Sequence, residues 1–291
     1  MTYRVAGLGE ILWDRFSDGD RMGGASANFA FHAGQLGAVA QIVSRLGRDT
    51  DGDRLFSALE KRGISTEFIQ RDSTYPTGLV RVELKEGQPT YLIEGPAAWD
   101  FLEFTDKLKQ FASRVDAVCF GTLAQRGPAS RGAIQSFIRS CPEPCLRLFD
   151  INLRQDFFSA ETIDFGLTQA TALKLNGDEL MRLAGLLGWP KQPKAALAEI
   201  FKRHPVDWIA VTHGADGCEI HTRNESIQAR APHVRCLDAV GAGDAFSAAL
   251  VVGILKGLPL AEIAERANCI GAYVASQAGG MPVLPEEYKI G

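Results

Sequence analysis

The chain has 291 residues, of which 46% are hydrophobic and 23% are charged, and its formal net charge at pH 7 is −4. This composition is ordinary for a globular protein and excludes a wholly disordered chain. The small negative charge argues against nucleic acid or an anionic membrane as the main partner. No apolar run reaches the length of about 18 residues that spans a bilayer, and no signal-peptide pattern is visible, so we expect a cytoplasmic protein.

Short apolar runs alternate with helical segments along the chain. The expected strands are 5–10, 39–43, 115–120, 146–151, 170–175 and 208–212, and the expected helices are 25–36, 53–61, 131–140, one from about 178, 245–255 and 261–276. The strands lack polar alternation, which is typical of a mainly parallel sheet with helices on both faces. We therefore predict one α/β domain over residues 1–291.

One stretch, residues 78–93, departs from this rhythm, because it alternates with period two across a Glu86-Gly87 turn. The alternation predicts a β-hairpin with one polar face. Such a hairpin can cover a site, pair two chains or decorate the edge of a sheet. We predict that it belongs to an inserted β lid made from about residues 12–22 and 76–99.

The six cysteines are too few for a disulfide scaffold in a chain of this length, which fits a reducing compartment. Cys141 and Cys145 form a Cys-x₃-Cys pair. No second pair follows at a zinc-like spacing, and no histidine lies in a His-Glu-x-x-His pattern. We predict that these cysteines act as small apolar residues.

The strongest local signal is a glycine-rich turn that runs straight into an apolar helix, Asp238-Ala239-Val240-Gly241-Ala242-Gly243-Asp244. Gly241 and Gly243 let the backbone turn sharply and bring its amides close to a ligand. The first turn of the next helix then offers free N–H groups to an anion, and Asp244 can face the reaction partner of that anion. The pattern also fits an ordinary Asp cap after a glycine turn.

Three weaker signals fit ligand binding, and each also fits an ordinary turn, cap or packed helix start. The run Gly23-Gly24-Ala25-Ser26-Ala27-Asn28 would offer amides to a polyhydroxy ligand. In Lys174-Leu175-Asn176-Gly177-Asp178-Glu179, the last residue could hold Mg²⁺ through water and Asn176 could contact phosphate. The loop Thr212-His213-Gly214-Ala215-Asp216-Gly217 would suit a nucleotide.

Other nucleotide motifs are missing from the sequence. The run Gly7-Leu8-Gly9 has Leu12 where a dinucleotide fingerprint needs its third glycine, which disfavours a nicotinamide-dependent oxidoreductase. No Gly-Lys dipeptide occurs, so a Walker A loop is excluded, and the protein-kinase motifs are absent.

Together these motifs resemble those of the ribokinase-like (PfkB) carbohydrate kinases. The matching residues are, in chain order, Gly23-Gly24-x₃-Asn28 with Leu36-Gly37, Gly47-x-Asp49-x-x-Gly52, Asp150-x-Asn152-x-Arg154, Asn176-x-x-Glu179, Thr212-x-Gly214-x-x-Gly217, Asp238-x-x-Gly241-Ala242-Gly243-Asp244 and Gly279-Gly280-x-Pro282. Two positions differ from the family pattern, with Ala239 in place of Thr and Ser26 in place of Pro. The runs 9–14, 76–78 and 97–100 look most like bacterial fructokinase-like members.

The resemblance implies ATP-dependent phosphorylation of a sugar hydroxymethyl group, with Mg²⁺, in a homodimer that pairs through the lid. It implies catalytic roles for Asp244, Gly241, Ala242, Gly243 and Arg154, and sugar contacts from Asp14, Gly23, Gly24, Asn28, Trp99 and Asp244. The nucleotide would contact Lys174, Asn176, Glu179, Thr212, Gly214, Gly217, Gly241, Gly243 and Asn268. Glu179 would hold Mg²⁺ through water, and Asp238, Val240 and Gly279 would hold a monovalent cation such as K⁺.

We expect the acceptor to be D-fructose. Asp14 follows the first strand and can accept two hydroxyl hydrogens, which suits a free sugar, and the fructokinase-like runs favour the same assignment. A nucleoside would need an aromatic slot, for which Phe16, Tyr91 and Trp99 are available. The alternatives are therefore a nucleoside, pentose or other hexose kinase of the same fold, and a silent sugar-binding relative, which the presence of Asp244 and Glu179 disfavours.

Overall fold

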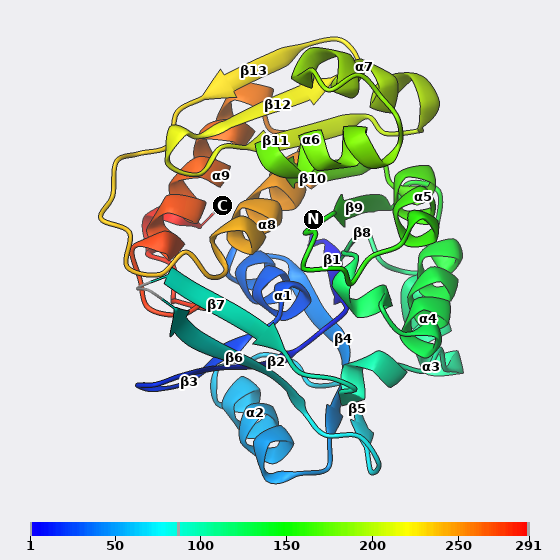
Figure 1. The fold of residues 1–291 in the computed structure, drawn as a ribbon, viewed down its shortest axis with the longest axis vertical. Helices are drawn as coiled ribbons and strands as arrows, with labels where there is room; N and C mark the ends of the chain where they lie inside the picture. Colours follow the sequence, from blue (N-terminus) through cyan, green and yellow to red (C-terminus); the bar gives the residue numbers. More distant parts are fainter. Residues whose placement is uncertain (1, 86–87, 290–291) are drawn as a thin grey trace.

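The computed structural model describes residues 2–85 and 88–289 (Figure 1). Within these ranges, only the backbone is described for residues 82–85 and 88–91. Its main sheet has nine described strands in the order β13-β12-β11-β10-β9-β8-β1-β4-β5. They are β1 (Arg4–Leu8), β4 (Val39–Gly47), β5 (Ile69–Asp72), β8 (Ala117–Phe120), β9 (Leu146–Asp150), β10 (Ala172–Asn176), β11 (Trp208–Thr212), β12 (Cys218–Thr222) and β13 (Ser226–Ala229). The strands from β11 to β5 are parallel, and β12 and β13 add an antiparallel edge.

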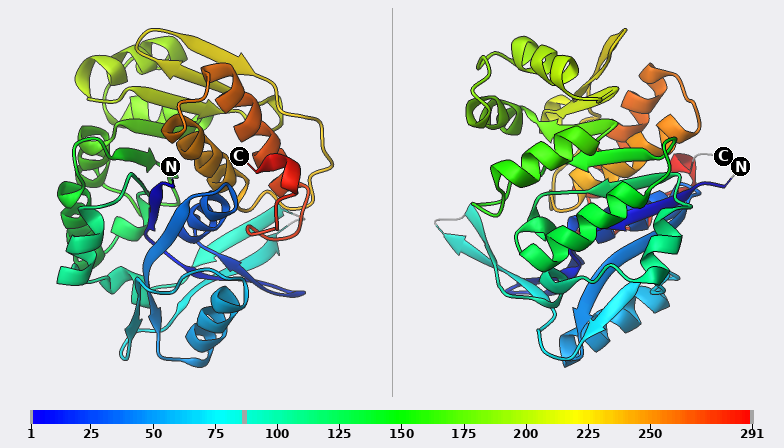
Figure 2. Two further views of the ribbon diagram at one scale, coloured as in Figure 1. Left: turned by 180° about the vertical axis from the view of Figure 1, so that it is seen from behind. Right: turned by 90° about the vertical axis from the view of Figure 1, so that its right-hand side faces the viewer.

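Helices cover both faces of the main sheet (Figures 1 and 2), which confirms the predicted fold class. One face packs against α1 (Ala25–Gln35), α8 (Ala242–Leu255) and α9 (Leu260–Ala275). The other face packs against α3 (Asp106–Ala112), α4 (Pro128–Ser140), α5 (Ala160–Gln169), α6 (Gly177–Leu186) and α7 (Pro193–Arg203). Among the described residues, no helix is both long and apolar enough to cross a bilayer.

The strand order reverses at β1, the central strand. The chain runs outward from β1 through β4 to β5, and then returns to add β8, β9, β10 and β11 on the other side of β1. In open parallel sheets, ligands bind beyond the carboxyl ends of the strands at such a switch point. The loops after β1, β9 and β10 therefore lie where a ligand site is expected.

A second sheet has the order β3-β2-β6-β7, built from β2 (Leu12–Phe16), β3 (Gly19–Gly23), β6 (Gly78–Lys85) and β7 (Gln88–Ile93). We call it the small sheet. The predicted hairpin of residues 78–93 is confirmed, since β6 and β7 pair antiparallel, although the Glu86-Gly87 turn lies outside the described residues. The small sheet projects from the body of the domain (Figure 2, right).

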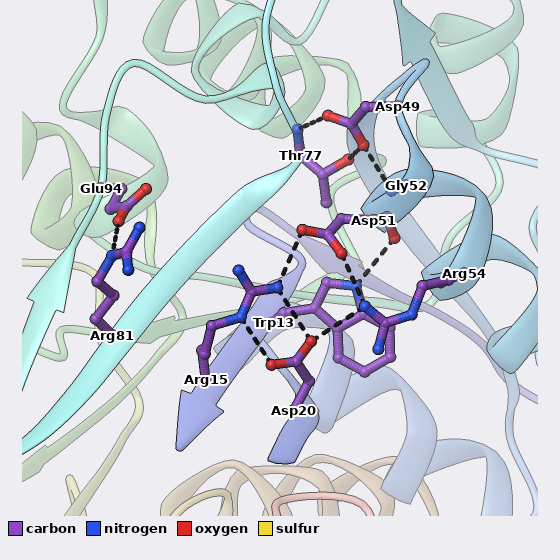
Figure 3. A network of polar contacts seen from close by, with 10 residues as sticks. All are labelled: Trp13, Arg15, Asp20, Asp49, Asp51, Gly52, Arg54, Thr77, Arg81 and Glu94. Atoms are coloured by element: carbon purple, nitrogen blue, oxygen red, sulfur yellow. Dashed lines mark hydrogen bonds and ion pairs between the residues drawn. The ribbon is translucent and has the colours of Figure 1, made fainter. Parts of the chain in front are cut away.

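Charged side chains join the small sheet to α2 (Thr50–Lys61) (Figure 3). Arg15 on β2 pairs with Asp20 on β3 and with Asp51 on α2, at 2.8 and 3.2 Å. Arg54 reaches the same two carboxylates, at 3.1 and 2.9 Å. The Trp13 indole also donates to the Asp51 carbonyl, at 2.9 Å. These contacts fix the position of the small sheet at the β2 end.

A second link fixes the β6 end of the small sheet. Asp49 is the N-cap of α2, and its carboxylate accepts from the Gly52 amide at 2.7 Å. The same carboxylate accepts from the Thr77 amide and hydroxyl, each at 2.7 Å, just before β6 begins (Figure 3). The two central strands of the small sheet, β2 and β6, are therefore both anchored to α2 or to its N-cap.

Candidate active site

Two cavities meet at the turn between β13 and α8. The inner cavity has a volume of about 290 Å³ and the outer cavity one of about 380 Å³. Both are lined by Ala239 and Gly243, so the turn forms the boundary between them. The predicted glycine-rich turn thus lies where two bound molecules would touch.

Backbone geometry at the start of α8 requires glycine. Gly241 is the N-cap residue with φ 78°, in the left-handed region, and a Cβ atom there would lie 2.5 Å from the Gly280 Cα. A Cβ on Gly243 would lie 2.9 Å from the Lys174 Nζ. Since the first amides of a helix have no intrahelical partner, this bare turn can bind an anion between the two cavities.

Asp244 lies in the first turn of α8 and lines the inner cavity. The Asn28 side-chain amide donates to its Oδ2 at 2.8 Å. Burial raises the pKa of Asp244 to about 6, the nearby Asp150 charge adds to the increase, and the Asn28 hydrogen bond opposes it. Asp244 is therefore ionised at neutral pH but is more basic than a surface aspartate, which suits a general base.

Two further carboxyl groups, Glu10 and Asp14, line the inner cavity and are buried. Burial raises the pKa of each to about 7, and repulsion from Asp244 contributes in both cases. Glu10 accepts the Ala25 amide at 2.9 Å. A Cβ on Gly23 would lie 2.1 Å from the Asp14 Oδ2, so Gly23 makes room for that carboxylate.

Two positively charged residues, Arg154 and Lys174, also line the inner cavity. Asn152, two residues before Arg154, has φ 40°, a left-handed conformation that Asn tolerates better than most residues. Arg154 lies two residues further along the same loop. Its charge lowers the pKa of Glu10, Asp14 and Asp244, and so partly offsets the effect of their burial.

The outer cavity is lined by four residues that were predicted to contact a nucleotide, namely Thr212, Gly214 and Gly217 of the predicted loop and Asn268 on α9. Apart from His233, the rest of its described lining is small or apolar, such as Phe246 on α8 and Ala272 on α9. Such a lining offers flat apolar contact and few polar groups, as an aromatic base requires.

Asn176 and Glu179 lie at the start of α6 and line neither cavity. They form a reciprocal capping box, in which the Asn176 Oδ1 accepts the Glu179 amide and the Glu179 Oε2 accepts the Asn176 amide, both at 2.8 Å. The Glu179 Oε1 accepts the Leu153 amide at 2.9 Å. A carboxylate oxygen can accept more than one hydrogen bond, so each oxygen can also accept from a metal-bound water.

Asp238, Val240 and Gly279 are brought together beside the turn. The Asp238 carboxylate accepts the Val240 amide at 3.0 Å through Oδ1 and the Gly279 amide at 3.1 Å through Oδ2. Asp238 therefore ties the loop before α8 to the loop after α9. Of these three residues, Val240 lines the inner cavity.

Trp99 does not lie where the sequence predicted. Its side chain is 1% exposed, belongs to a hydrophobic core and does not line the inner cavity. The 3₁₀ turn Ala98–Phe101 carries the ring inward, where Arg126 stacks on one side of it at 4.0 Å and Gly78 leaves space for the indole. The predicted sugar contact at Trp99 is therefore wrong.

Glu10, Asp150 and Ser247 were not among the predicted site residues, yet they lie in or beside the site. Asp150 accepts hydrogen bonds from Lys174 and from the Ser247 hydroxyl. Each is a polar residue inside or at the end of an apolar run, and that interruption is the signal that could have identified it.

Comparison with known proteins identifies the family of the chain. The pattern of the pfkB family carbohydrate kinases matches residues 15–287. A fructokinase of Escherichia coli is 27% identical over 98% of this chain and 97% of its own length. An aminoimidazole riboside kinase of Salmonella typhimurium is 27% identical over 90% of this chain and 84% of its own.

Solved structures share the fold. A fructokinase of Xylella fastidiosa, crystallised with bound ATP, superposes with a TM-score of 0.87 at 22% identity, covering 98% of this chain and 96% of that one. The matched family region includes the described lining of the outer cavity, the turn, and the lining of the inner cavity except Glu10, Leu12 and Asp14. The chain therefore belongs to the pfkB family of carbohydrate kinases.

Proposed function

We propose that the protein transfers the γ-phosphoryl group of ATP to a hydroxymethyl group of D-fructose. Family membership makes it a phosphotransferase that acts on an alcohol group of a sugar. The observation that carries the proposal is the junction of the two cavities at a bare helix N-terminus, with a basic carboxylate on the inner side.

Each group of site residues has its own role in the proposed reaction. The outer cavity, through Thr212, Gly214, Gly217 and Asn268, holds the nucleotide, which supplies the phosphoryl group when bound. Asp244 takes the proton of the acceptor hydroxyl as its oxygen bonds to phosphorus and the bond to the leaving diphosphate breaks. The amides of Gly241 to Asp244 and the Arg154 guanidinium stabilise the charge on the transferred group, which is most of what phosphoryl transfer needs.

The inner cavity favours an uncharged acceptor. Glu10, Asp14 and Asp244 place three carboxyl groups there, and both cations, Arg154 and Lys174, share the cavity with the start of α8. A sugar phosphate or sugar acid would bring a further negative charge among these three carboxyl groups. Neutral hydroxyls would instead donate to Asp14, while Gly24 and Asn28 provide further polar contacts beside it.

A sugar fits the described lining better than a nucleoside. None of the lining residues whose side chains are described is aromatic, and the larger apolar ones are Leu12, Val80, Ile93, Leu123 and Val240. A nucleobase would have no ring to stack on among them. The Tyr91 side chain lies outside the described residues, so the expectation for Tyr91 stays a prediction.

An acceptor panel tests the assignment. With ATP and Mg²⁺, we expect kcat/KM for fructose to exceed that for ribose, adenosine, aminoimidazole riboside and fructose 6-phosphate by at least about tenfold. A buried carboxylate left without its hydroxyl partner costs roughly 1–3 kcal/mol. A lead by adenosine or ribose would overturn the fructose assignment alone, whereas transfer to no acceptor would favour a sugar-binding protein.

Two metal ions are proposed with the nucleotide. Glu179 would bind Mg²⁺ through water, for which its carboxylate keeps acceptor capacity beyond its two amide contacts. Asp238, with the Val240 and Gly279 backbone, would hold a monovalent cation such as K⁺, and the carboxylate already draws these two loops together. A cation there would order the turn without touching the acceptor.

The metal prediction has two parts. Chelation of Mg²⁺ should abolish transfer, and Glu179→Ala should raise the Mg²⁺ concentration for half-maximal rate. The matched control is Glu262→Ala, which removes an acidic residue from the first turn of α9 and should leave the Mg²⁺ requirement unchanged. The rate in KCl should exceed that in tetramethylammonium chloride at equal ionic strength, and equal rates would argue against the K⁺ site.

We also propose that the small sheet closes over the acceptor and pairs two chains. Val80 and Ile93 on its strands line the inner cavity, while Leu92, on the opposite side of β7, is 52% exposed. Closure would exclude water, which competes with the sugar for the phosphoryl group.

Removal of the hairpin tests both roles of the small sheet. With residues 80–91 replaced by a short glycine linker, we expect more ATP hydrolysed per sugar phosphorylated, together with a monomer in sedimentation. The parent chain serves as the control in both measurements. An unchanged ratio of ATP hydrolysed to sugar phosphorylated would reject the lid role. A variant that still sediments in the same oligomeric state as the parent chain would reject the pairing.

A further inference from the structure

A buried charge cluster lies directly beneath the anion-binding turn. Its members are Asp150 at the end of β9, Lys174 on β10 and Ser247 on α8, and all three are buried. The Lys174 Nζ lies 3.1 and 3.2 Å from the two Asp150 carboxylate oxygens. The Ser247 hydroxyl donates to the Asp150 Oδ2 at 2.9 Å.

Strand register explains how these charges meet. Asp150 and Lys174 are direct partners across the parallel pair β9–β10. Leu146, Leu148 and Ala172 occupy the same face of these strands and pack in the core against α8. Because side chains alternate along a strand, Asp150 and Lys174 continue that row to its carboxyl end, below the first turn of α8.

Stability of the fold does not account for the pair. Replacing a buried ion pair by apolar residues of similar volume is often neutral or stabilising, because desolvation of two charges offsets their attraction. The remainder of this row is apolar and could continue as such. Instead, the charged pair lies where the Lys174 side chain reaches the turn. A Cβ atom on Gly243 would be only 2.9 Å from the Lys174 Nζ.

We propose that Asp150 is a positioning residue for phosphoryl transfer, which holds the Lys174 ammonium against the turn and whose own negative charge acts on the Asp244 carboxylate. The proposal rests on the base role given to Asp244 under the proposed function. Asp150 would not touch either substrate. Lys174 would place a fixed positive charge under the transferred group, and Ser247 would fix the orientation of the Asp150 carboxylate.

Electrostatics around Asp244 agree with this assignment. The charged or titratable groups that act on it or respond to it are Glu10, Asp14, Cys119, Asp150, Arg154 and Lys174. After burial, repulsion from Asp150 is the largest influence that raises the pKa of Asp244, while Lys174 and Arg154 lower it. Asp150 therefore offsets the lowering of the Asp244 pKa by Lys174, the cation that it holds in position.

The test is the pH dependence of kcat/KM for the acceptor in Asp150→Asn, a variant of the same shape without the charge. In the unmodified enzyme, kcat/KM should fall at low pH as Asp244 becomes protonated, and we call this part of the profile the acidic limb. In Asp150→Asn we expect the acidic limb to move to lower pH by about half a unit or more, because a like charge near Asp244 has been removed. We expect kcat on the plateau to fall roughly tenfold to a hundredfold, because Lys174 is no longer held in place.

The matched control is Asp72→Asn, at the end of β5. Asp72 is also buried and ion-paired, with the Arg45 Nε at 2.7 Å, but it lines neither cavity. This variant should lose thermal stability and keep its acidic limb. If Asp150→Asn does not fold, Lys174→Met should shift the limb in the opposite direction, to higher pH, because a positive charge near Asp244 is lost.

The outcomes separate this proposal from the function on which it rests. A lower rate with an unmoved limb in Asp150→Asn would overturn the proposal, since a merely structural residue would behave in that way. So would a limb that moves to lower pH in Lys174→Met. Absence of phosphoryl transfer in the unmodified enzyme would instead overturn the proposed function.

Discussion

Asp244→Asn is expected to bind sugar and nucleotide normally and to lose most turnover. An asparagine keeps the shape of the side chain and its contact with Asn28, but its amide cannot accept the hydroxyl proton. Loss of a general base typically lowers kcat about 10²- to 10⁴-fold. Steady-state rates, with binding of both ligands measured by calorimetry, provide the check. Near-normal turnover in a purified, folded variant would contradict the base assignment.

The dependence of kcat/KM on pH provides a second test of the same prediction. Asp244 must be ionised to accept a proton, and burial raises its pKa to about 6. In the unmodified enzyme kcat/KM should therefore fall as the pH decreases below about 6. At higher pH Asp244 stays ionised, so its titration should no longer change kcat/KM. In Asp244→Asn the residual rate should lack this limb. Glu10 and Asp14 titrate near pH 7 and would add their own effect through acceptor binding.

Gly241→Ala is expected to cause the second large loss of activity. The new Cβ would lie 2.5 Å from the Gly280 Cα and 2.6 Å from its carbonyl oxygen, so the turn must move away from the loop after α9. A displacement of about 1 Å in a positioning group can lower the rate about 10²-fold. We expect a loss of that size in kcat, measured at saturating substrate, with the fold retained by circular dichroism.

The opposite end of the same helix provides the control. Gly257 follows α8, has φ 66°, and would place a Cβ with no described atom within 4 Å. Gly257→Ala therefore adds the same left-handed strain, about 1–2 kcal/mol, without a clash. It should lower the melting temperature and leave kcat unchanged. Equal losses of kcat in the two variants would show that strain in the helix, and not the shape of the turn, limits the rate.

The fold was predictable where single segments carry the signal. Apolar strands such as β8 and the helices α1 and α8 were predicted to within a few residues. The edge strands β12 and β13 were missed, because Cys218–Thr222 and Ser226–Ala229 are short and largely polar. The helix α7 was also missed, although its buried residues Ala196, Leu197 and Ile200 have helical spacing.

The candidate site was predictable only as far as its motifs. The glycine turns, Asp14, Asn28 and Asp244 follow one another in a recognisable order, and the fold brings them to one place. The direction of the Trp99 ring depends on packing against Arg126, which no local pattern encodes. Likewise, Asp150 and Lys174 become neighbours only through the register of two strands that are separated in the chain by a helix.

The contact between Asn28 and Asp244 spans 216 residues, and it has a consequence for synthesis of the chain. On the ribosome, α1 and the central strand emerge first, whereas α8 leaves almost last. Until then Phe29 on α1 and Leu148 on β9 lack the α8 side chains that they pack with in the folded protein, and long-range pairing of this kind is slow. A nascent or prematurely ended chain also lacks the proton acceptor. Under the proposed function, phosphoryl transfer therefore begins only when the polypeptide is nearly complete.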